Sequence, residues 1–211
     1  MYRRGCYFCG HEANKKKMMD GTLVNVDVTA PGATIALALM FLKTESEVVA
    51  SRLSIPCTYF DLQYVRPDFI MLRVIAQNLI MWSREWIEEQ IPEIVRKGVM
   101  NIGDDSSDDD DKDMEALIQA YVNIVAGACI SLGLRYAGSR NSDAQELLYN
   151  YAIYFLNEIK PISVTSGDAL PKGLSQYVDR FTLETCLHLI VLSLTVVLLK
   201  FLVKPRGSGP P

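Results

Sequence analysis

Two cysteines and a histidine near the N-terminus come closest to the pattern of a metal site. Cys6, Cys9 and His11 follow the Cys-x-x-Cys spacing with which many zinc sites begin. Zinc needs about four ligands in a tetrahedron, but the chain has no second cysteine pair, and its only other histidine is His188. A redox role for the Cys-x-x-Cys pair has even less support, because no thioredoxin-like βαβ pattern surrounds it. We therefore expect two free thiols in a loose N-terminal segment, and no metal site.

An acidic run over residues 104–113 has the composition of a calcium loop without its pattern. An EF-hand needs glycine at the sixth position of the loop and glutamate at the twelfth, and the sixth residue of this run is Asp109. We interpret residues 101–113 as a solvated acidic loop. Ser106 and Ser107 each have an acidic residue three positions later. They are candidate kinase acceptors, where a phosphate would add charge to a loop that already repels itself.

The remaining polar residues do not form a catalytic group. Cys186 and His188 lie in the apolar C-terminal segment, and we interpret both as core residues. No Ser–His–Asp or Cys–His–Asn set can be assembled, and no glycine-rich phosphate loop is present. The sequence therefore predicts a protein that is not an enzyme, with no catalytic residues, no cofactor and no small-molecule substrate.

Composition limits the classes of partner. The 211 residues suit one domain or one and a half, and 49% of them are hydrophobic, so we expect part of the surface to lie against a partner or another part of a larger protein. The net charge is −4, and lysine and arginine are mostly scattered, which argues against nucleic acid. Five cysteines without regular spacing indicate reduced thiols in a cytosolic or nuclear protein.

Hydrophobic periodicity predicts an all-α protein with one short extended segment, residues 22–28. Residues 1–20 are expected to be flexible, 21–203 to form the helical region and 204–211 to be a disordered tail. Thr29 is the expected N-cap of the first helix, with Pro31 in its first turn. The predicted helices are 33–42, 44–54 with a capping box at its start, 67–82, 86–95 broken at Pro92, 114–137, 143–159 and 183–203.

An internal repeat relates two of these helices. Residues 31–44 align with residues 126–139, so that Gly32 falls on Gly127 and the match continues into the turn and the partner helix. A third, incomplete copy begins near residues 192–194. Small residues in each copy let helices approach closely, as in stacked helical hairpins of a solenoid or ring. The alternative is that two helices rich in Ala, Gly and Leu look alike through composition.

Several segments resemble the proteasome/cyclosome repeat family, in particular the repeats of the large scaffold subunit of the anaphase-promoting complex (cyclosome). They are residues 24–33, 64–69, 124–134, 137–139 and 183–188, and the similarity covers about residues 21–197. The chain departs from the family between Trp82 and Trp86, where only three residues remain, and after Val197, where the expected turn is replaced. We therefore expect a fragment or truncated copy that stops partway through a repeat.

The resemblance implies a curved or closed helical ring inside a nuclear and cytoplasmic ubiquitin ligase that drives mitotic progression and exit. It implies a scaffold whose partners are other subunits of the anaphase-promoting complex. Ubiquitin transfer in that complex is carried by cullin and RING subunits, so the resemblance brings no catalytic residue to this chain.

The last apolar segment supports a different hypothesis, a small helical protein anchored in a membrane through residues 183–203. From Thr185 to Leu199 no side chain carries a full charge when His188 is neutral. A membrane span needs about 20 residues, whereas stretches of about 10–14 are more typical of buried helices. A carbonate-resistant membrane fraction would favour the anchor.

Overall fold

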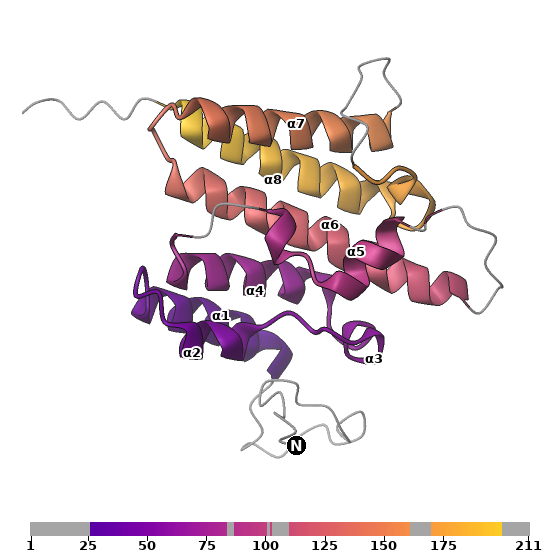
Figure 1. Cartoon of the computed structure of the whole chain (residues 1–211), viewed down its shortest axis with the longest axis horizontal. Helices are drawn as coiled ribbons and strands as arrows, with labels where there is room; N and C mark the ends of the chain where they lie inside the picture. Colours follow the sequence, from indigo (N-terminus) through magenta and orange to yellow (C-terminus); the bar gives the residue numbers. More distant parts are fainter. Residues whose placement is uncertain (1–25, 84–86, 101, 103–109, 161–169, 200–211) are drawn as a thin grey trace, which may run out of the picture.

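The computed structural model describes residues 26–83, 87–100, 102, 110–160 and 170–199, and all regular secondary structure in these ranges is helical. Four helices form an inner stack, side by side in chain order (Figure 1). They are α1 (Val26–Met40), α4 (Pro67–Ile80), α6 (Asp110–Arg135) and α8 (Arg180–Leu198). The predicted all-α class of paired helices is confirmed.

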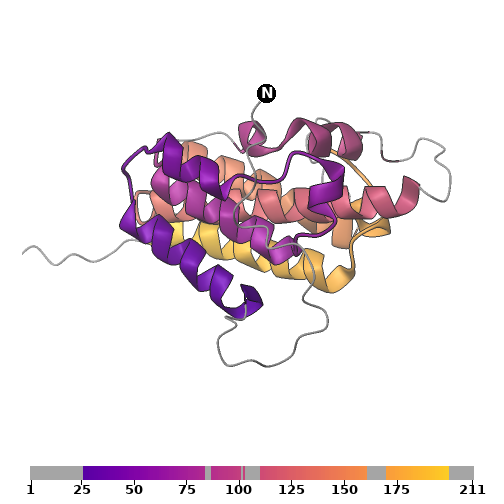
Figure 2. The same ribbon diagram turned by 90° about the horizontal axis from the view of Figure 1, so that it is seen from below.

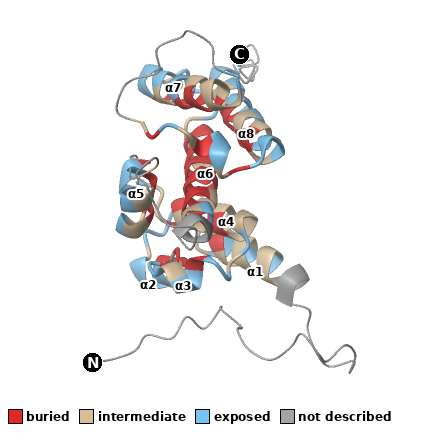
Figure 3. Cartoon of the chain, turned by 90° about the vertical axis from the view of Figure 1, so that its right-hand side faces the viewer, coloured by how far each residue is buried: buried red, intermediate tan, exposed pale blue. Residues whose placement is uncertain are grey.

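The other helices cover the stack. The short helices α2 (Glu47–Ala50), α3 (Tyr59–Leu62) and α5 (Glu93–Met100) lie on one side of it (Figures 2 and 3). The longer α7 (Ser142–Ile159) packs along α8. Three single turns of 3-10 helix complete the described structure: η1 (Ser51–Leu53), η2 (Glu88–Gln90) and η3 (Leu174–Gln176).

Helix α6 forms the centre of the protein. It contacts α4 on one side and α8 on the other, with α5 and α3 also against it (Figure 3). From Leu117 to Cys129 nearly every one of its residues is buried. A helix that is apolar on all sides is stable only when neighbours surround it, which explains why this segment occupies the middle of the stack.

Local sequence signals set several helix ends, and the one at Pro67 was expected. Pro67 is the first residue of α4, where its missing N–H costs nothing. The Asn141 side chain accepts a hydrogen bond from the Ala144 N–H at 2.8 Å at the start of α7. Asp179 accepts one from the Thr182 N–H at 2.9 Å at the start of α8, and its hydrogen bonds to the Thr182 hydroxyl and N–H lower the pKa of this carboxyl. Pro92 separates η2 from α5, so the predicted break there is confirmed.

The predicted extended segment is wrong where it can be checked. Val26 to Val28 are already helical, and residues 22–25 lie outside the described residues. Pro31 is inside α1 rather than in its first turn, so Thr29 is not the N-cap. A single strand leaves its backbone N–H and C=O groups unpaired, and no strand in the described ranges is available to pair with it.

Two other boundaries differ from the prediction. The partner helix expected over residues 44–54 shortens to α2 and η1, because the Thr44 hydroxyl donates to the Phe41 carbonyl instead of capping the next helix. The acidic loop is shorter than expected, since α6 begins at Asp110. Acidic residues suit the first turn of a helix, where the helix dipole favours negative charge. The short α3 was not predicted.

Candidate functional site

The turn after α1 joins that helix to the next inner helix. Lys43 and Glu45 both adopt left-handed backbone conformations, with φ of 59° and 54°. The Lys43 N–H donates to the Leu79 carbonyl at 2.9 Å, and the Glu45 N–H donates to the Ile80 carbonyl at 3.1 Å. Left-handed conformations are costly for residues other than glycine. Here they aim two N–H groups at carbonyls at the end of α4 that have no partner within their own helix.

The turn after α6 repeats this arrangement on α8. Gly138 and Arg140 have φ of 68° and 56°. Their N–H groups donate to the Val196 carbonyl at 2.9 Å and the Val197 carbonyl at 3.2 Å. In both copies, therefore, two N–H groups from residues two positions apart bind two successive carbonyls at the end of the next inner helix.

A hydroxyl hydrogen bond also recurs at equivalent positions. The Thr44 hydroxyl donates to the Phe41 carbonyl at 2.8 Å, and the Ser139 hydroxyl donates to the Tyr136 carbonyl at 2.7 Å. These are the same pairs that the sequence alignment of residues 31–44 with 126–139 placed together. The alignment thus reflects a shared three-dimensional unit, which removes the alternative of a chance similarity in composition.

Small residues allow the inner helices to approach closely. A Cβ atom on Gly127 of α6 would lie 2.8 Å from the Met71 carbonyl oxygen of α4. A Cβ on Gly133 of α6 would lie 2.7 Å from the Cβ and 2.9 Å from the Cα of Ser193 on α8. Both distances are shorter than atoms of these types tolerate. Helix α6 is therefore in close backbone contact with both α4 and α8. The C-terminal ends of the four inner helices lie on the same side of the stack (Figure 1).

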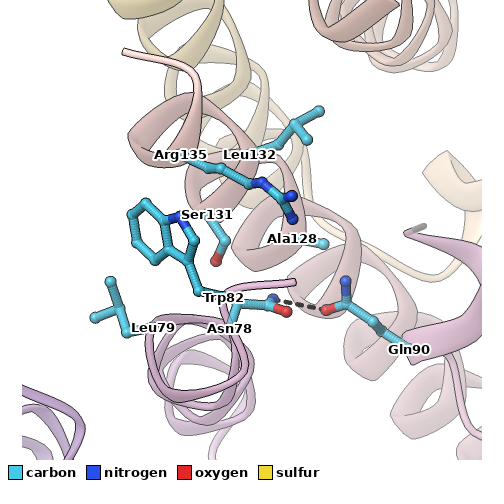
Figure 4. Close-up of a pocket in the computed structure, with 8 residues that line it drawn as sticks. All are labelled: Asn78, Leu79, Trp82, Gln90, Ala128, Ser131, Leu132 and Arg135. Carbon is cyan, nitrogen blue, oxygen red and sulfur yellow. Dashed lines mark hydrogen bonds between the residues drawn. The ribbon is translucent and has the colours of Figure 1, made fainter. Parts of the chain in front are cut away.

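A cleft lies where the end of α4 meets α6 (Figure 4). Asn78 is buried, and its Nδ2 donates to Gln90 Oε1 at 2.7 Å. Among the described residues no donor reaches Asn78 Oδ1. Trp82 and Arg135 form part of the wall, and Lys43 Nζ lies 4.0 Å from the centre of the Trp82 ring. The enclosed space is about that of one water molecule, too small for the sites that hold small organic ligands.

Three buried tyrosines surround the packing of α6 against α7. Burial raises the pKa of Tyr121 to about 12, and it also raises the pKa of Tyr151 and of Tyr154 well above the usual value. Because burial raises the pKa of all three tyrosines, each hydroxyl stays protonated and uncharged at neutral pH.

Alkaline pH should unfold the protein through these tyrosines. Exposed tyrosine in the unfolded chain titrates near pH 10, whereas Tyr121 in the folded state titrates near pH 12. Above about pH 10 the unfolded state binds fewer protons, so the free energy of unfolding falls as pH rises towards the folded pKa. Urea titrations at increasing pH should show a smaller loss of stability for Tyr121→Phe than for the wild type. Equal losses would contradict this prediction.

The described cysteines should differ sharply in reactivity. Cys57 is exposed, whereas Cys129 and Cys186 are buried. Burial raises the pKa of Cys186 to about 12 and that of Cys129 further, and only the thiolate is nucleophilic. In a variant with Cys6 and Cys9 changed to serine, a disulfide reagent should modify Cys57 quickly and the two buried thiols only after denaturation. Rapid modification of all three in the folded protein would contradict the structure.

The structure describes only some of the candidate residues that the sequence suggested. Cys6, Cys9, Ser106 and Ser107 lie outside the described residues, as does His11. Cys186 is in the core as predicted. The prediction for His188 is wrong because it lies on the outer face of α8 and is exposed. The described residues contain no cluster of three or more His, Cys, Asp or Glu side chains placed to hold a metal ion.

Known proteins that are similar to this chain match almost its whole length. Residues 5–199 match the family model described as "APC1 fifth domain". The chain belongs to the APC1 fifth-domain family. Anaphase-promoting complex subunit 1 of Arabidopsis thaliana is 62% identical over 198 residues, which cover 92% of this chain and 11% of the relative. The human subunit 1 is 34% identical over 215 residues, covering 99% of this chain and 10% of the relative.

A fungal member of this family has a name that refers to the cell cycle. The "Negative regulator of mitosis" of Emericella nidulans is 33% identical over 178 residues, which cover 82% of this chain and 8% of the relative. The chain therefore spans about a tenth of the length of such relatives, over the part that the APC1 fifth-domain model describes. This agrees with the resemblance to the anaphase-promoting complex noted in the sequence.

Two described helices are long and apolar enough to cross a membrane by length and composition alone, Met114–Arg135 and Arg180–Leu198. The first is largely buried inside the protein. The second turns Ile190, Ser193 and Val197 into the core. The buried core helix of a soluble protein passes the same test, which explains Met114–Arg135, whereas the window in Arg180–Leu198 is 28% buried. Both helices lie within the residues that match the APC1 fifth-domain model. The anchor hypothesis is therefore not favoured.

Proposed function

We propose that this chain is a non-catalytic scaffold segment of the anaphase-promoting complex, a ubiquitin ligase of the cell cycle. The observation that carries this proposal is the repeated turn, which binds the end of α1 to α4 and the end of α6 to α8, each through two backbone hydrogen bonds. Such a unit fixes how one inner helix packs on the next. Stacked repeats form long outer surfaces that other proteins can bind. Membership of the APC1 fifth-domain family supplies the identity of the assembly.

The distribution of polar groups supports a structural role. The buried tyrosines and cysteines are held neutral, and the cleft between α4 and α6 is too small for an organic substrate. The exposed surface instead carries large apolar side chains, among them Phe60, Tyr149 and Phe181. Exposed aromatic residues are typical of protein interfaces. The partners we propose are other subunits of the complex, in the nucleus and the cytoplasm.

Affinity purification of the tagged full chain from dividing cells, followed by mass spectrometry, tests this proposal. We expect cullin, RING and other subunits of the anaphase-promoting complex among the recovered proteins. A Phe155→Ala variant is the matched control, because loss of this buried ring weakens the stack without changing an exposed residue. Subunits that require the folded stack should be reduced in the control. Recovery of chaperones alone with the wild-type chain would overturn the proposal.

Localisation is tested separately by imaging the same tagged chain. We expect signal in both nucleus and cytoplasm. Fractionation of the same cells adds a second measurement. Recovery of the tagged chain only in a carbonate-resistant membrane fraction would contradict the proposal and would support a membrane anchor at residues 183–203.

A further inference from the structure

The contact between α4 and α6 lacks the turn that ties the other inner helices together. The turn after α1 binds the end of α4, and the turn after α6 binds the end of α8, each through two backbone hydrogen bonds. Between the described residues of α4 and α6 no backbone hydrogen bond of this kind is formed. The C-terminal end of this contact instead has the cleft of Figure 4, which is lined by polar side chains from both helices.

The side-chain oxygen of Asn78 lies at this cleft without a donor. Asn78 is only 7% exposed, and its Nδ2 donates to Gln90 Oε1 at 2.7 Å. Its Oδ1 is buried, and no donor from the described residues reaches it. A buried acceptor without a donor is costly, so native proteins pair nearly all such atoms with a protein group or with an ordered water. The α4 side of the cleft therefore needs an occupant that donates a hydrogen bond.

Polar groups on the other walls complete the site. The Ser131 hydroxyl points from α6 towards the Asn78 amide (Figure 4). It donates to the Gly127 carbonyl at 2.8 Å, and its oxygen keeps lone pairs with which it can accept. Gln90 and Arg135 also line the cleft, and each of these side chains has more than one N–H donor. The cleft therefore offers an acceptor from α4, an acceptor from α6 and N–H donors beside them.

Size and charge narrow the occupant to one kind. The enclosed space of about 10 Å³ is close to the least that one water molecule needs. An anion cannot donate to Asn78 Oδ1. A metal cation is disfavoured, because the Arg135 guanidinium lines the cleft and Lys43 Nζ lies 4.0 Å from the centre of the Trp82 ring in its wall. Water fits the space, and it both donates and accepts hydrogen bonds.

We propose that one ordered water molecule binds in this cleft, donates to Asn78 Oδ1 and to Ser131 Oγ, and so joins α4 to α6. The N–H groups of Gln90 or Arg135 supply the hydrogen bond that this water accepts. A bridging water is nearly as favourable in enthalpy as a direct hydrogen bond. The α4–α6 contact thereby gains a polar link near the helix ends, where the repeated turn serves the α1–α4 and α6–α8 contacts. The proposal does not depend on the proposed function.

A crystal structure of the full wild-type chain, at a resolution that shows ordered water, tests the site directly. We expect a water oxygen about 2.5–3.0 Å from both Asn78 Oδ1 and Ser131 Oγ, the usual range for hydrogen bonds between oxygen atoms. A protein donor at Asn78 Oδ1, or no ordered density beside it, would overturn the proposal. A water that contacts Asn78 but no group of α6 would also overturn it, because such a water does not join the helices.

Magnetic relaxation dispersion of water oxygen, which counts long-lived waters in solution, gives a second measurement. Asn78→Leu keeps a similar side-chain shape but removes the acceptor, so this variant should lose one long-lived water relative to the wild type. Asn123→Leu is the matched control, because Asn123 is similarly buried and its Nδ2 bonds to the Gln119 carbonyl within α6. The control should keep the wild-type count. An unchanged count in Asn78→Leu, with its fold confirmed by far-UV circular dichroism, would overturn the proposal. If Asn78→Leu does not fold, the wild-type crystal structure decides alone.

Discussion

Gly133→Ala is expected to lower the free energy of unfolding by about 1–3 kcal/mol, the usual cost of overpacking a tight contact. The new methyl group would lie 2.7 Å from the Cβ and 2.9 Å from the Cα of Ser193. The Cα belongs to the backbone of α8, so a change of side-chain rotamer cannot relieve the overlap. Helices α6 and α8 must move apart instead, and the hydrogen bonds from Gly138 and Arg140 to the end of α8 would lengthen with them.

Gly32→Ala is the matched control for this substitution. Gly32 is also inside an inner helix, but a Cβ there meets nothing within 4 Å. Alanine should therefore stabilise α1 by about 0.5–1 kcal/mol, because it loses less backbone entropy than glycine on forming a helix. Urea unfolding followed by far-UV circular dichroism measures both variants. A stabilising effect of Gly133→Ala would mean that α6 and α8 are not in backbone contact.

Phe155→Ala is expected to have the largest effect of any single change considered, about 3–5 kcal/mol of lost stability. Phe155 is fully buried between α7 and the stack, and its ring lies edge-on to Tyr154 with centroids 5.5 Å apart. Removing the ring leaves a cavity that rigid helices on both sides cannot close. A domain of ordinary stability has about 5–15 kcal/mol in total, so the variant should be partly unfolded at moderate temperature.

The control for this cavity is Tyr149→Ala on the same helix. Tyr149 is 54% exposed, so its loss should change the free energy of unfolding by no more than about 0.5 kcal/mol. Thermal and urea unfolding of both variants compares them directly. Similar losses for the two would show that α7 does not pack on the stack as described.

Sequence patterns predicted most long helices well, for physical reasons that are local. The segments that became α4, α6, α7 and α8 carry apolar residues at helical spacing, and proline or a capping side chain marks the start of several of them. The repeat was visible because the small residues and the hydroxyl after the helix recur together. Those features depend on neighbours within a few positions along the chain, and so a sequence contains them directly.

Other features were decided by contacts between distant residues. The extended segment became part of α1, since no strand in the described residues pairs with it. His188 is exposed although its helix is strongly apolar, because the described neighbours of α8, the helices α6 and α7, lie on the other face of that helix. The left-handed conformations of Lys43, Glu45 and Arg140 have no signal in residue type, and they follow from the hydrogen bonds that those residues make to the next inner helix.

The sequence by itself determined the all-helical class, the repeat and the family to which the chain belongs, because periodicity, glycine placement and turn chemistry act over short distances. The tertiary structure alone decided that the inner helices stack in parallel and which glycines are in backbone contact. Those properties arise from the order in which helices pack, and packing depends on shape and backbone hydrogen bonds between segments far apart in the chain.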